Sequence, residues 1–281
     1  MKSKLWSRMA GAVGVVALTG AALTACGGGS SSPSSSSGTS LLNQIIKRGT
    51  LRVGIMPDSP PFGQQMSDGT FQGYDADIAK ELAASLGAKV QFVALTGDSR
   101  NAALDSGRTD VDISTFSVTP QRAQSVEFTI PYTQIDSALL YKKSESITSL
   151  KQLKGKSVAV GSGTTNDTYL TEECKSVGCK VMRFDAIADA IQALKSGKVD
   201  AAMDSSFSMD QEAQADSSLA VLDPTPKINA AFIAMGVKRG DQLWLNYLNT
   251  FIETLNGSGE NATLSQKWFH ADVPAAIPYA Q

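Results

Sequence analysis

The chain has 281 residues, of which 42% are hydrophobic and 19% charged, with 25 basic and 27 acidic side chains, one histidine and three cysteines. This length suits one large domain or two medium-sized ones. The near-neutral charge and modest lysine and arginine content argue against nucleic-acid binding. One histidine and three cysteines exclude a His-rich or four-thiolate zinc site, so we expect neither a metal nor another cofactor.

The first forty residues differ from the rest of the chain. Lys2, Lys4 and Arg8 form a basic start, and residues 9–23 are an uncharged apolar run with the length of a signal-peptide core, short for a membrane span. The Leu-Thr-Ala-Cys that ends at Cys26 resembles the bacterial lipobox. We therefore expect a lipoprotein signal peptide at 1–25 and a lipid anchor on Cys26 at the outer face of the cell membrane. A plain signal peptide with an incidental cysteine is the alternative.

The segment that follows is predicted to be a tether. Residues 27–40 are almost wholly glycine and serine, a composition that cannot bury enough apolar surface to order itself. Residues 26–44 are therefore interpreted as a lipidated cysteine with a Gly/Ser tether. Export to an oxidising space also favours a disulfide between Cys174 and Cys179, with two free thiols at a helix end as the alternative.

From residue 41 onward, helical and strand patterns alternate. An amphipathic helix is indicated by Ile78, Leu82 and Leu86, with Gly87 after its end. Further helices are predicted at 100–106 and 186–196 and around Trp244 and Trp268, and strands at 51–55, 90–93, 111–113, 157–160, 181–184, 201–203 and 232–236. This alternation predicts an α/β fold with mainly parallel sheets.

One short segment occurs twice. Residues 103–110 (ALDSGRTD) and 193–200 (ALKSGKVD) each run from a helix end through a glycine into a strand. The repeat favours two similar lobes, with a common helix–strand turn as the alternative explanation.

Polar residues that follow a strand are candidates for binding, because ligands of open α/β sheets lie beyond the carboxyl ends of the strands. Thr119 is a suitable helix N-cap, and Arg122 falls three positions later, where a cation opposes the positive end of the helix dipole. An external anion would favour this arrangement. Arg122, with a hydroxyl of Ser114 or Ser117, is therefore predicted to hold a carboxylate, and a solvated surface arginine is the alternative.

Eight segments occur in an order that resembles the family 3 extracellular solute-binding proteins, the polar amino-acid receptors of ABC importers. The likeness covers nearly all of residues 45–270. The segments are LRVGI (51–55), PPF (60–62), GYDADIA (73–79), SGRTDVDIS (106–114), FSVTPQRA (116–123), EFTIPY (127–132), GSGTT (161–165) and SGKVDAAMD (196–204).

The resemblance implies a two-lobed, periplasmic-binding-protein-like type II fold, with two α/β lobes joined by two crossover segments. Lobe 1 is expected at 45–135 and 231–281, and lobe 2 at 136–230. It also implies a monomer without enzymatic activity that closes around a free amino acid and delivers it to a membrane permease. The site residues carried over by position are Arg122 for the α-carboxylate, Ser117 and Thr115 beside it, and Thr164 and Thr165 of lobe 2. Ser114, Phe62 and Tyr74 are further candidates for the site.

Arg100 stands where acidic-amino-acid receptors of the family have an arginine that reaches a side-chain carboxylate. An acidic or neutral-polar amino acid is therefore expected, with glutamate as the first candidate. The family places an acid for the ligand ammonium five residues beyond Asp200, where this chain has Ser205, so Asp204 is the substitute. Ser59 and Gly97 replace the aromatic residues of basic-amino-acid receptors, which argues against lysine or arginine as ligand.

Two other functions share this fold. A cyclohexadienyl dehydratase would need an acid–base pair, for which Asp204 and Glu127 are the candidates. A ligand-sensing lipoprotein without a transporter would differ only in its partner.

Overall fold

The computed structural model describes residues 40–222 and 227–271, all of which belong to one compact unit. The predicted signal peptide, Cys26 and the tether up to residue 39 lie outside the described residues. Within the two described ranges, no helix is long and apolar enough to cross a membrane.

The first lobe is built on a five-stranded sheet with the order β5-β1-β6-β14-β7. The strands are β1 (Thr50–Ile55), β5 (Lys89–Ala94), β6 (Val111–Asp112), β7 (Glu127–Phe128) and β14 (Gly236–Val237). β1 pairs in parallel with β5 and β6, whereas β14 is antiparallel to its neighbours. Leu51, Val53 and Val111 pack in one core with helix residues such as Ile78 and Trp244, so the apolar positions of the strands are buried under helices.

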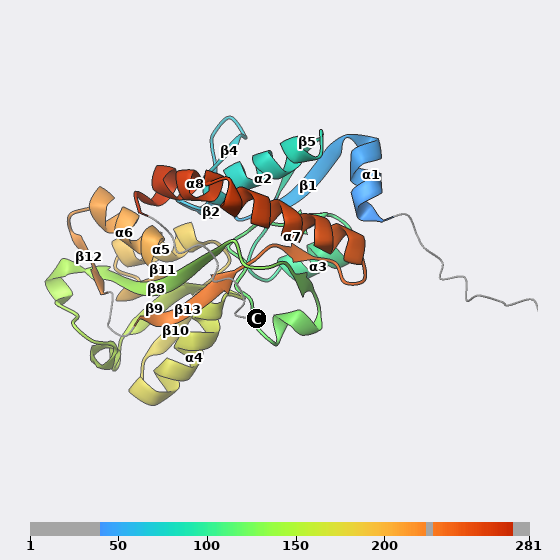
Figure 1. Cartoon of the computed structure of the whole chain (residues 1–281). Helices are drawn as coiled ribbons and strands as arrows, with labels where there is room; N and C mark the ends of the chain where they lie inside the picture. Colours follow the sequence, from blue (N-terminus) through green and yellow to red (C-terminus); the bar gives the residue numbers. More distant parts are fainter. Residues whose placement is uncertain (1–39, 223–226, 272–281) are drawn as a thin grey trace, which may run out of the picture. The chain divides into compact units, whose positions relative to one another are not determined.

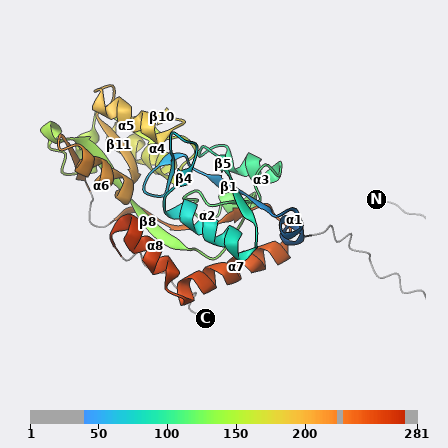
Figure 2. The ribbon, with the colours of Figure 1, turned by 90° about the horizontal axis from the view of Figure 1, so that it is seen from above.

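The α-helices among the described residues of this lobe are α1 (Leu41–Arg48), α2 (Tyr74–Ser85), α3 (Arg100–Asp105), α7 (Gln242–Gly257) and α8 (Glu260–Phe269). Figure 2 shows α2, α7 and α8 together with α1 at one end of the compact unit. Lobe 1 also contains a small antiparallel sheet of β2 (Asp58–Ser59), β3 (Gly63–Gln65) and β4 (Phe71–Gln72).

The second lobe has a sheet with the order β10-β9-β11-β8-β12, and β13 also pairs with β8. Its strands are β8 (Thr133–Lys142), β9 (Ser157–Gly161), β10 (Lys180–Phe184), β11 (Ala201–Ser205), β12 (Leu219–Leu222) and β13 (Ile228–Ile233). The helices are α4 (Thr165–Val177), α5 (Ile187–Lys195) and α6 (Ser206–Ala215), with the short 3-10 helices η2 (Lys143–Glu145) and η3 (Leu150–Leu153). β9 lies between two parallel neighbours, as β1 does in lobe 1. The α/β fold that the sequence predicts is confirmed, but the prediction of mainly parallel sheets is wrong. Each large sheet is mixed, because β14 in lobe 1 and β8 in lobe 2 pair antiparallel with their neighbours.

The two lobes are joined by the antiparallel strands β8 and β13, which run between them (Figure 1). The pairing starts at Thr133 with Ile233 and becomes irregular between Ala231 and Ile228. The expectation of two crossover segments is therefore met. The lobe bounds predicted from the sequence, 45–135 with 231–281 and 136–230, cut through both strands and stay a prediction.

Two elements differ from the sequence interpretation. Residues 41–44, assigned to the tether, form the first half of α1, because Ser40 caps that helix and bonds to Asp241 at the start of α7 (2.8 Å). The long strand β8 was not anticipated. The predicted disulfide between Cys174 and Cys179 is present, at the end of α4.

Candidate ligand-binding site

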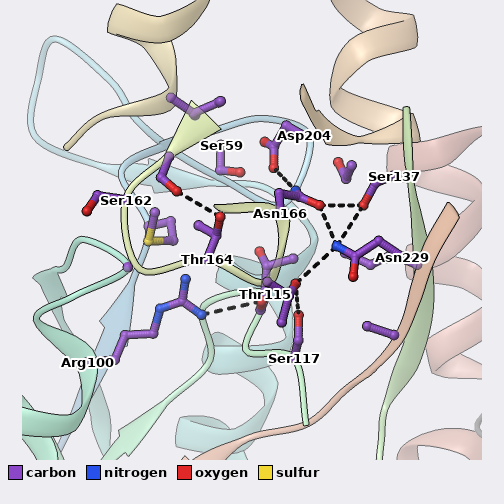
Figure 3. A pocket seen from close by; sticks show the side chains of 18 of the residues that line it. Ser59, Arg100, Thr115, Ser117, Ser137, Ser162, Thr164, Asn166, Asp204 and Asn229 are labelled. Atoms are coloured by element: carbon purple, nitrogen blue, oxygen red, sulfur yellow. Dashed lines mark hydrogen bonds between the residues drawn. The ribbon is translucent and has the colours of Figure 1, made fainter. Parts of the chain in front are cut away.

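A cavity of about 50 Å³ is enclosed between the two lobes (Figure 3). It lies beyond the carboxyl ends of β6, β9 and β11, where a ligand of parallel α/β sheets is expected. Seven of the ten predicted binding residues line it: Arg100, Thr115, Ser117, Arg122, Thr164, Thr165 and Asp204.

The other three predicted residues do not line the cavity. Phe62 and Tyr74 are fully buried in the core of lobe 1, where their rings pack edge to face at 6.4 Å. The Tyr74 hydroxyl donates to Asn261 Oδ1 at 2.5 Å. Ser114 is also fully buried, and its hydroxyl has no hydrogen-bond partner among the described residues. The prediction that these three side chains belong to the binding site is therefore corrected: they lie in the interior of lobe 1 and not at the cavity.

Arg122 bridges the two lobes. Its guanidinium donates to the carbonyl oxygens of Ser117 in lobe 1 (2.8 Å) and Gly163 in lobe 2 (2.9 Å), and it lies over the Phe116 ring. Thr119 Oγ1 accepts from Arg122 N as predicted, but the helix is only the 3-10 turn η1 (Arg122–Gln124). Burial, and secondly the nearby Arg100, lower the pKa of Arg122 to about 9, so it remains a cation at neutral pH.

The start of α4 presents polar groups to the cavity from lobe 2. Thr164 is the N-cap residue, and its hydroxyl oxygen accepts from Asp167 N at 3.1 Å. The Thr165 hydroxyl lies 3.3 Å from the Ser117 hydroxyl of lobe 1. Hydroxyl groups at a helix N-terminus suit an anion, so Arg122, Ser117 and Thr165 form one end of the site that can hold a carboxylate.

A carboxylate lies at the other end. Asp204 Oδ1 accepts from Asn166 Nδ2 at 3.2 Å, and burial raises the pKa of Asp204 to about 6. The next residue, Ser205, also lines the cavity and caps α6 through Ser208 N. Asp204 and Ser205 are the last two residues of β11, and both line the cavity.

Among the lining residues that were not predicted, Asn229, Asn166 and Ser137 form one hydrogen-bonded group. Asn229 occurs in the irregular part of β13, with a positive φ of 48° that asparagine tolerates better than most residues. Its side-chain amide donates to Asn166 Oδ1 at 2.6 Å, and the Ser137 hydroxyl donates to the same oxygen at 2.6 Å (Figure 3). These bonds fix the Asn166 amide so that its nitrogen points at Asp204. The only sequence signal was the place of Asn166 directly after the Thr-Thr turn.

Arg100 lies under the cavity at the start of α3. It is 3% exposed, lies over the Phe116 ring at 4.9 Å, and reaches the Thr115 carbonyl oxygen at 3.5 Å (Figure 3). Asp75, buried beside it, accepts from Thr115 N (2.8 Å) and from the Tyr132 hydroxyl (2.8 Å), which holds the Thr115 loop in place.

The lobes also touch at the edge of the cavity. The Ser162 hydroxyl donates to Asp98 Oδ2 at 2.6 Å. A Cβ at Gly97 would lie 2.2 Å from the Ser162 carbonyl oxygen, and one at Gly163 would lie 2.1 Å from Asp98 Oδ1. Both glycines are required for this close approach, and the structure is therefore a closed arrangement of the lobes.

Comparisons with known proteins agree with this architecture. The model of the bacterial extracellular solute-binding proteins, family 3, matches residues 51–271. The L-cystine-binding protein TcyJ of Escherichia coli (strain K12) is 32% identical over 83% of this chain and 87% of its own length. The glutamine-binding protein of Geobacillus stearothermophilus is 34% identical over 70% of this chain and 76% of its own.

Among solved structures, the ancestral amino acid-binding protein AncCDT-1, described as a precursor of cyclohexadienyl dehydratase, has a TM-score of 0.75 and 33% identity. The match covers 82% of this chain and 99% of that one. The chain belongs to the family 3 bacterial extracellular solute-binding proteins. The resemblance found in the sequence is confirmed, and so is the two-lobed fold class.

Proposed function

We propose that this protein is the receptor of an ABC importer, and that it captures a polar amino acid between its lobes and presents it to a membrane permease. The observation that carries the proposal is the charge arrangement of the cavity: the buried guanidinium of Arg100, the half-buried guanidinium of Arg122, and the carboxylate of Asp204 on the opposite lobe. A zwitterion loses its hydration in such a cavity and needs a partner for each charge. The names of the relatives, which include cystine-binding and glutamine-binding proteins, support an amino acid as ligand.

In this proposal the α-carboxylate binds between Arg122, Ser117 and the start of α4, and the α-ammonium binds Asp204. Both lobes then contact the same ligand. Because the open form lacks the contacts from one of the lobes, the ligand binds the closed form more tightly and so favours closure. The carbonyl oxygens of Ser117 and Gly163 accept hydrogen bonds from the Arg122 guanidinium and keep it in position to bind the carboxylate.

The ligand side chain is proposed to be acidic or neutral and polar, with glutamate as the first candidate. Arg100 is the remaining cation at the cavity and repels a basic side chain. No aromatic residue of the described chain lines the cavity, so a long basic side chain has no ring to stack on. The small volume of the cavity, about 50 Å³, favours a compact ligand.

Calorimetric titration of the protein with the twenty amino acids tests the proposal. We expect heat release with an acidic or neutral-polar amino acid. Arg122→Ala is expected to weaken that binding by about 2 to 5 kcal/mol, because it leaves a buried carboxylate unpaired. Arg239→Ala is the matched control, since Arg239 is an exposed arginine of the same lobe. Equal affinities of wild type and Arg122→Ala would remove Arg122 from the site.

We also propose that the mature chain is lipid-anchored through Cys26 at the outer face of the cell membrane. The lipobox-like sequence supports this proposal. Metabolic labelling with a palmitate analogue should mark the wild type and leave Cys26→Ser unlabelled and no longer membrane-bound. A Cys26→Ser protein that still fractionates with membranes would contradict the anchor.

The enzymatic alternative receives less support. Its acid–base pair would need Glu127 near Asp204, but Glu127 belongs to β7 and is not among the described residues that line the cavity. Absence of turnover of arogenate and prephenate is the result expected of a pure receptor.

A further inference from the structure

Asn229 lies at a β-bulge in one of the two strands that join the lobes. Between two successive pairs of the ladder, β13 advances three residues, from 228 to 231, while β8 advances two, from Ser137 to Ile135. Asn229 belongs to this longer stretch and has a positive φ of 48°. A bulge of this kind re-aims a side chain. The Asn229 amide accordingly lies at the cavity, between its two ends (Figure 3).

One hydrogen bond of the Asn229 amide acts on the Asp204 end of the cavity. Asn229 Nδ2 donates to Asn166 Oδ1 at 2.6 Å, and the Ser137 hydroxyl donates to the same oxygen at 2.6 Å. With its oxygen bonded to two donors, the Asn166 amide turns its nitrogen to Asp204 Oδ1, 3.2 Å away. An ionised carboxylate only accepts hydrogen bonds, so this orientation of Asn166 suits it. The opposite orientation would set two oxygen atoms against each other.

The remaining N–H of Asn229 acts on the other end of the cavity. Asn229 Nδ2 lies 3.3 Å from Ser137 Oγ and 3.4 Å from Thr165 Oγ1, so these two oxygens share it. Because an amide nitrogen only donates, Thr165 Oγ1 accepts here, and its own O–H is left to donate to Ser117 Oγ, 3.3 Å away. The Ser117 O–H is then left for a ligand. This end of the cavity thus offers hydrogen atoms to a carboxylate.

Building on the proposed function, which sets the α-carboxylate at Ser117 and the α-ammonium at Asp204, we propose that Asn229 is a positioning residue that gives the two ends of the site opposite hydrogen-bonding polarity. Through Thr165 it makes one end a donor, and through Asn166 it keeps the other end an acceptor. Asn229 thereby determines how strongly the site prefers an α-amino acid over an analogue that lacks one of the two α-groups.

Asn229→Gly tests the proposal, because glycine adopts a positive φ without strain and so keeps the bulge while it removes the amide. Calorimetry compares glutamate with glutarate, which lacks the ammonium, and with 4-aminobutyrate, which lacks the α-carboxylate. We expect Asn229→Gly to bind glutamate about tenfold more weakly and each analogue about threefold more weakly, because an analogue uses only one of the two ends. The preference for glutamate over both analogues should therefore fall.

Ser146→Gly is the matched control. Ser146 also has a positive φ, of 51°, but it is exposed and is not among the described residues that line the cavity, so this variant should bind all three ligands as the wild type does. If Asn229→Gly weakens all three ligands by the same factor, the amide has only a general structural role and the proposal is overturned. Unchanged affinities overturn it as well. Both results leave the proposed function intact, since the wild type still binds glutamate.

A second measurement needs no ligand. Burial raises the pKa of Asp204 to about 6. The other groups that act on this carboxyl are the backbone N–H of Ser205, Asp58, Asn166 and Arg100. In Asn229→Gly the Asn166 amide is free to turn away, so the pKa of Asp204, followed through the carbon-13 resonance of its carboxyl group, should rise by about one pH unit.

An unchanged pKa of Asp204 in Asn229→Gly would show that Asn229 does not orient Asn166, and the proposal would fall. If no amino acid binds the wild type, the proposed function and the preference for α-amino acids fail together. The titration then still decides whether Asn229 sets the polarity of the cavity.

Discussion

In both lobes a helix ends at a glycine with positive φ and leads directly into the central parallel strand. Gly107 (φ 69°) follows α3 before β6, and Gly197 (φ 77°) follows α5 before β11. These are the two copies of the segment that the sequence repeats. In each copy the glycine N–H and the next N–H return to carbonyl oxygens of the helix end, so the same turn is built twice.

The aspartate that closes each copy also has the same role. Asp110 Oδ2 accepts from the backbone N–H of Arg52 on β1, and Asp200 Oδ2 accepts from that of Ser157 on β9, both at 2.7 Å. Each carboxylate therefore fixes the start of the neighbouring strand. Both copies thus form the same helix–strand turn at the same place in the two lobes.

The surroundings of the two aspartates differ. The Asp110 side chain is fully buried, bonds to the guanidinium groups of Arg48 at the end of α1 and Arg52, and its carbonyl oxygen accepts from Trp244 Nε1 at 3.0 Å. Asp200 is half-buried and accepts additionally from the Ser157 hydroxyl at 2.7 Å. The same turn thus joins α1 and α7 to the sheet in lobe 1, whereas in lobe 2 it fixes one strand.

The largest expected effect comes from removing these two carboxylates. Asp110→Ala should lower the free energy of unfolding by about 3 kcal/mol, because it leaves two arginines uncompensated. This figure is at the low end for a broken buried pair, since both arginines are about one-third exposed. Asp200→Ala loses hydrogen bonds from a single residue and should cost about 1 kcal/mol. Urea unfolding of both variants measures the difference.

If Asp110→Ala and Asp200→Ala lowered the free energy of unfolding by the same amount, the proposed difference between the two aspartates would be wrong. Arg48→Ala adds a check on the cause: it should account for part of the loss in Asp110→Ala and add nothing further in the double variant.

The repeat could be predicted from sequence because glycine and aspartate act there through local backbone geometry. The same holds for the Thr119 cap, whose hydroxyl oxygen accepts from the backbone N–H of Arg122. Asn229 could not be predicted, because its place depends on an irregular pairing between β13 and β8, which are far apart in the chain. Ser137 was missed for the same reason, since β8 was not recognised.

Phe62 and Tyr74, in contrast, were assigned to the binding site but do not line the cavity. The sequence places them within motifs that border the cleft, but a motif fixes a position along the chain and not the face on which a side chain lies. Both rings bury apolar surface against Phe269 of α8, and Phe62 also packs against Phe207 of α6. Only the packing of α8 and α6, which come much later in the chain, decides this.

A second pair of equivalent turns shows how the lobes differ in packing. In lobe 1, α2 leads through Gly87 into β5, and in lobe 2, α4 leads through Gly178 into β10. α2 buries seven of its 12 residues, whereas α4 buries three of its 13. Leu86 closes the first turn from within the apolar core, and the Cys174–Cys179 disulfide closes the second. The disulfide thus closes the turn after α4, the helix of this pair that buries fewer of its residues.

The smaller expected effect is the loss of this disulfide. Replacing both cysteines by serine should lower the free energy of unfolding by about 2 kcal/mol, the value that loop closure gives for so short a loop. A reducing agent should bring the wild type to the same value and leave the double variant unchanged. Leu86→Ala, the counterpart in lobe 1, should lose a comparable amount through lost burial but keep its full sensitivity to reduction.

Hydrogen exchange locates the effect of the disulfide. Exchange should become faster in the last turn of α4 when the disulfide is removed and stay unchanged in α2, because a bond that closes a short loop constrains mainly that loop. Equal acceleration in both helices would show that the disulfide stabilises the whole chain, and that the thin packing of α4 does not explain its position.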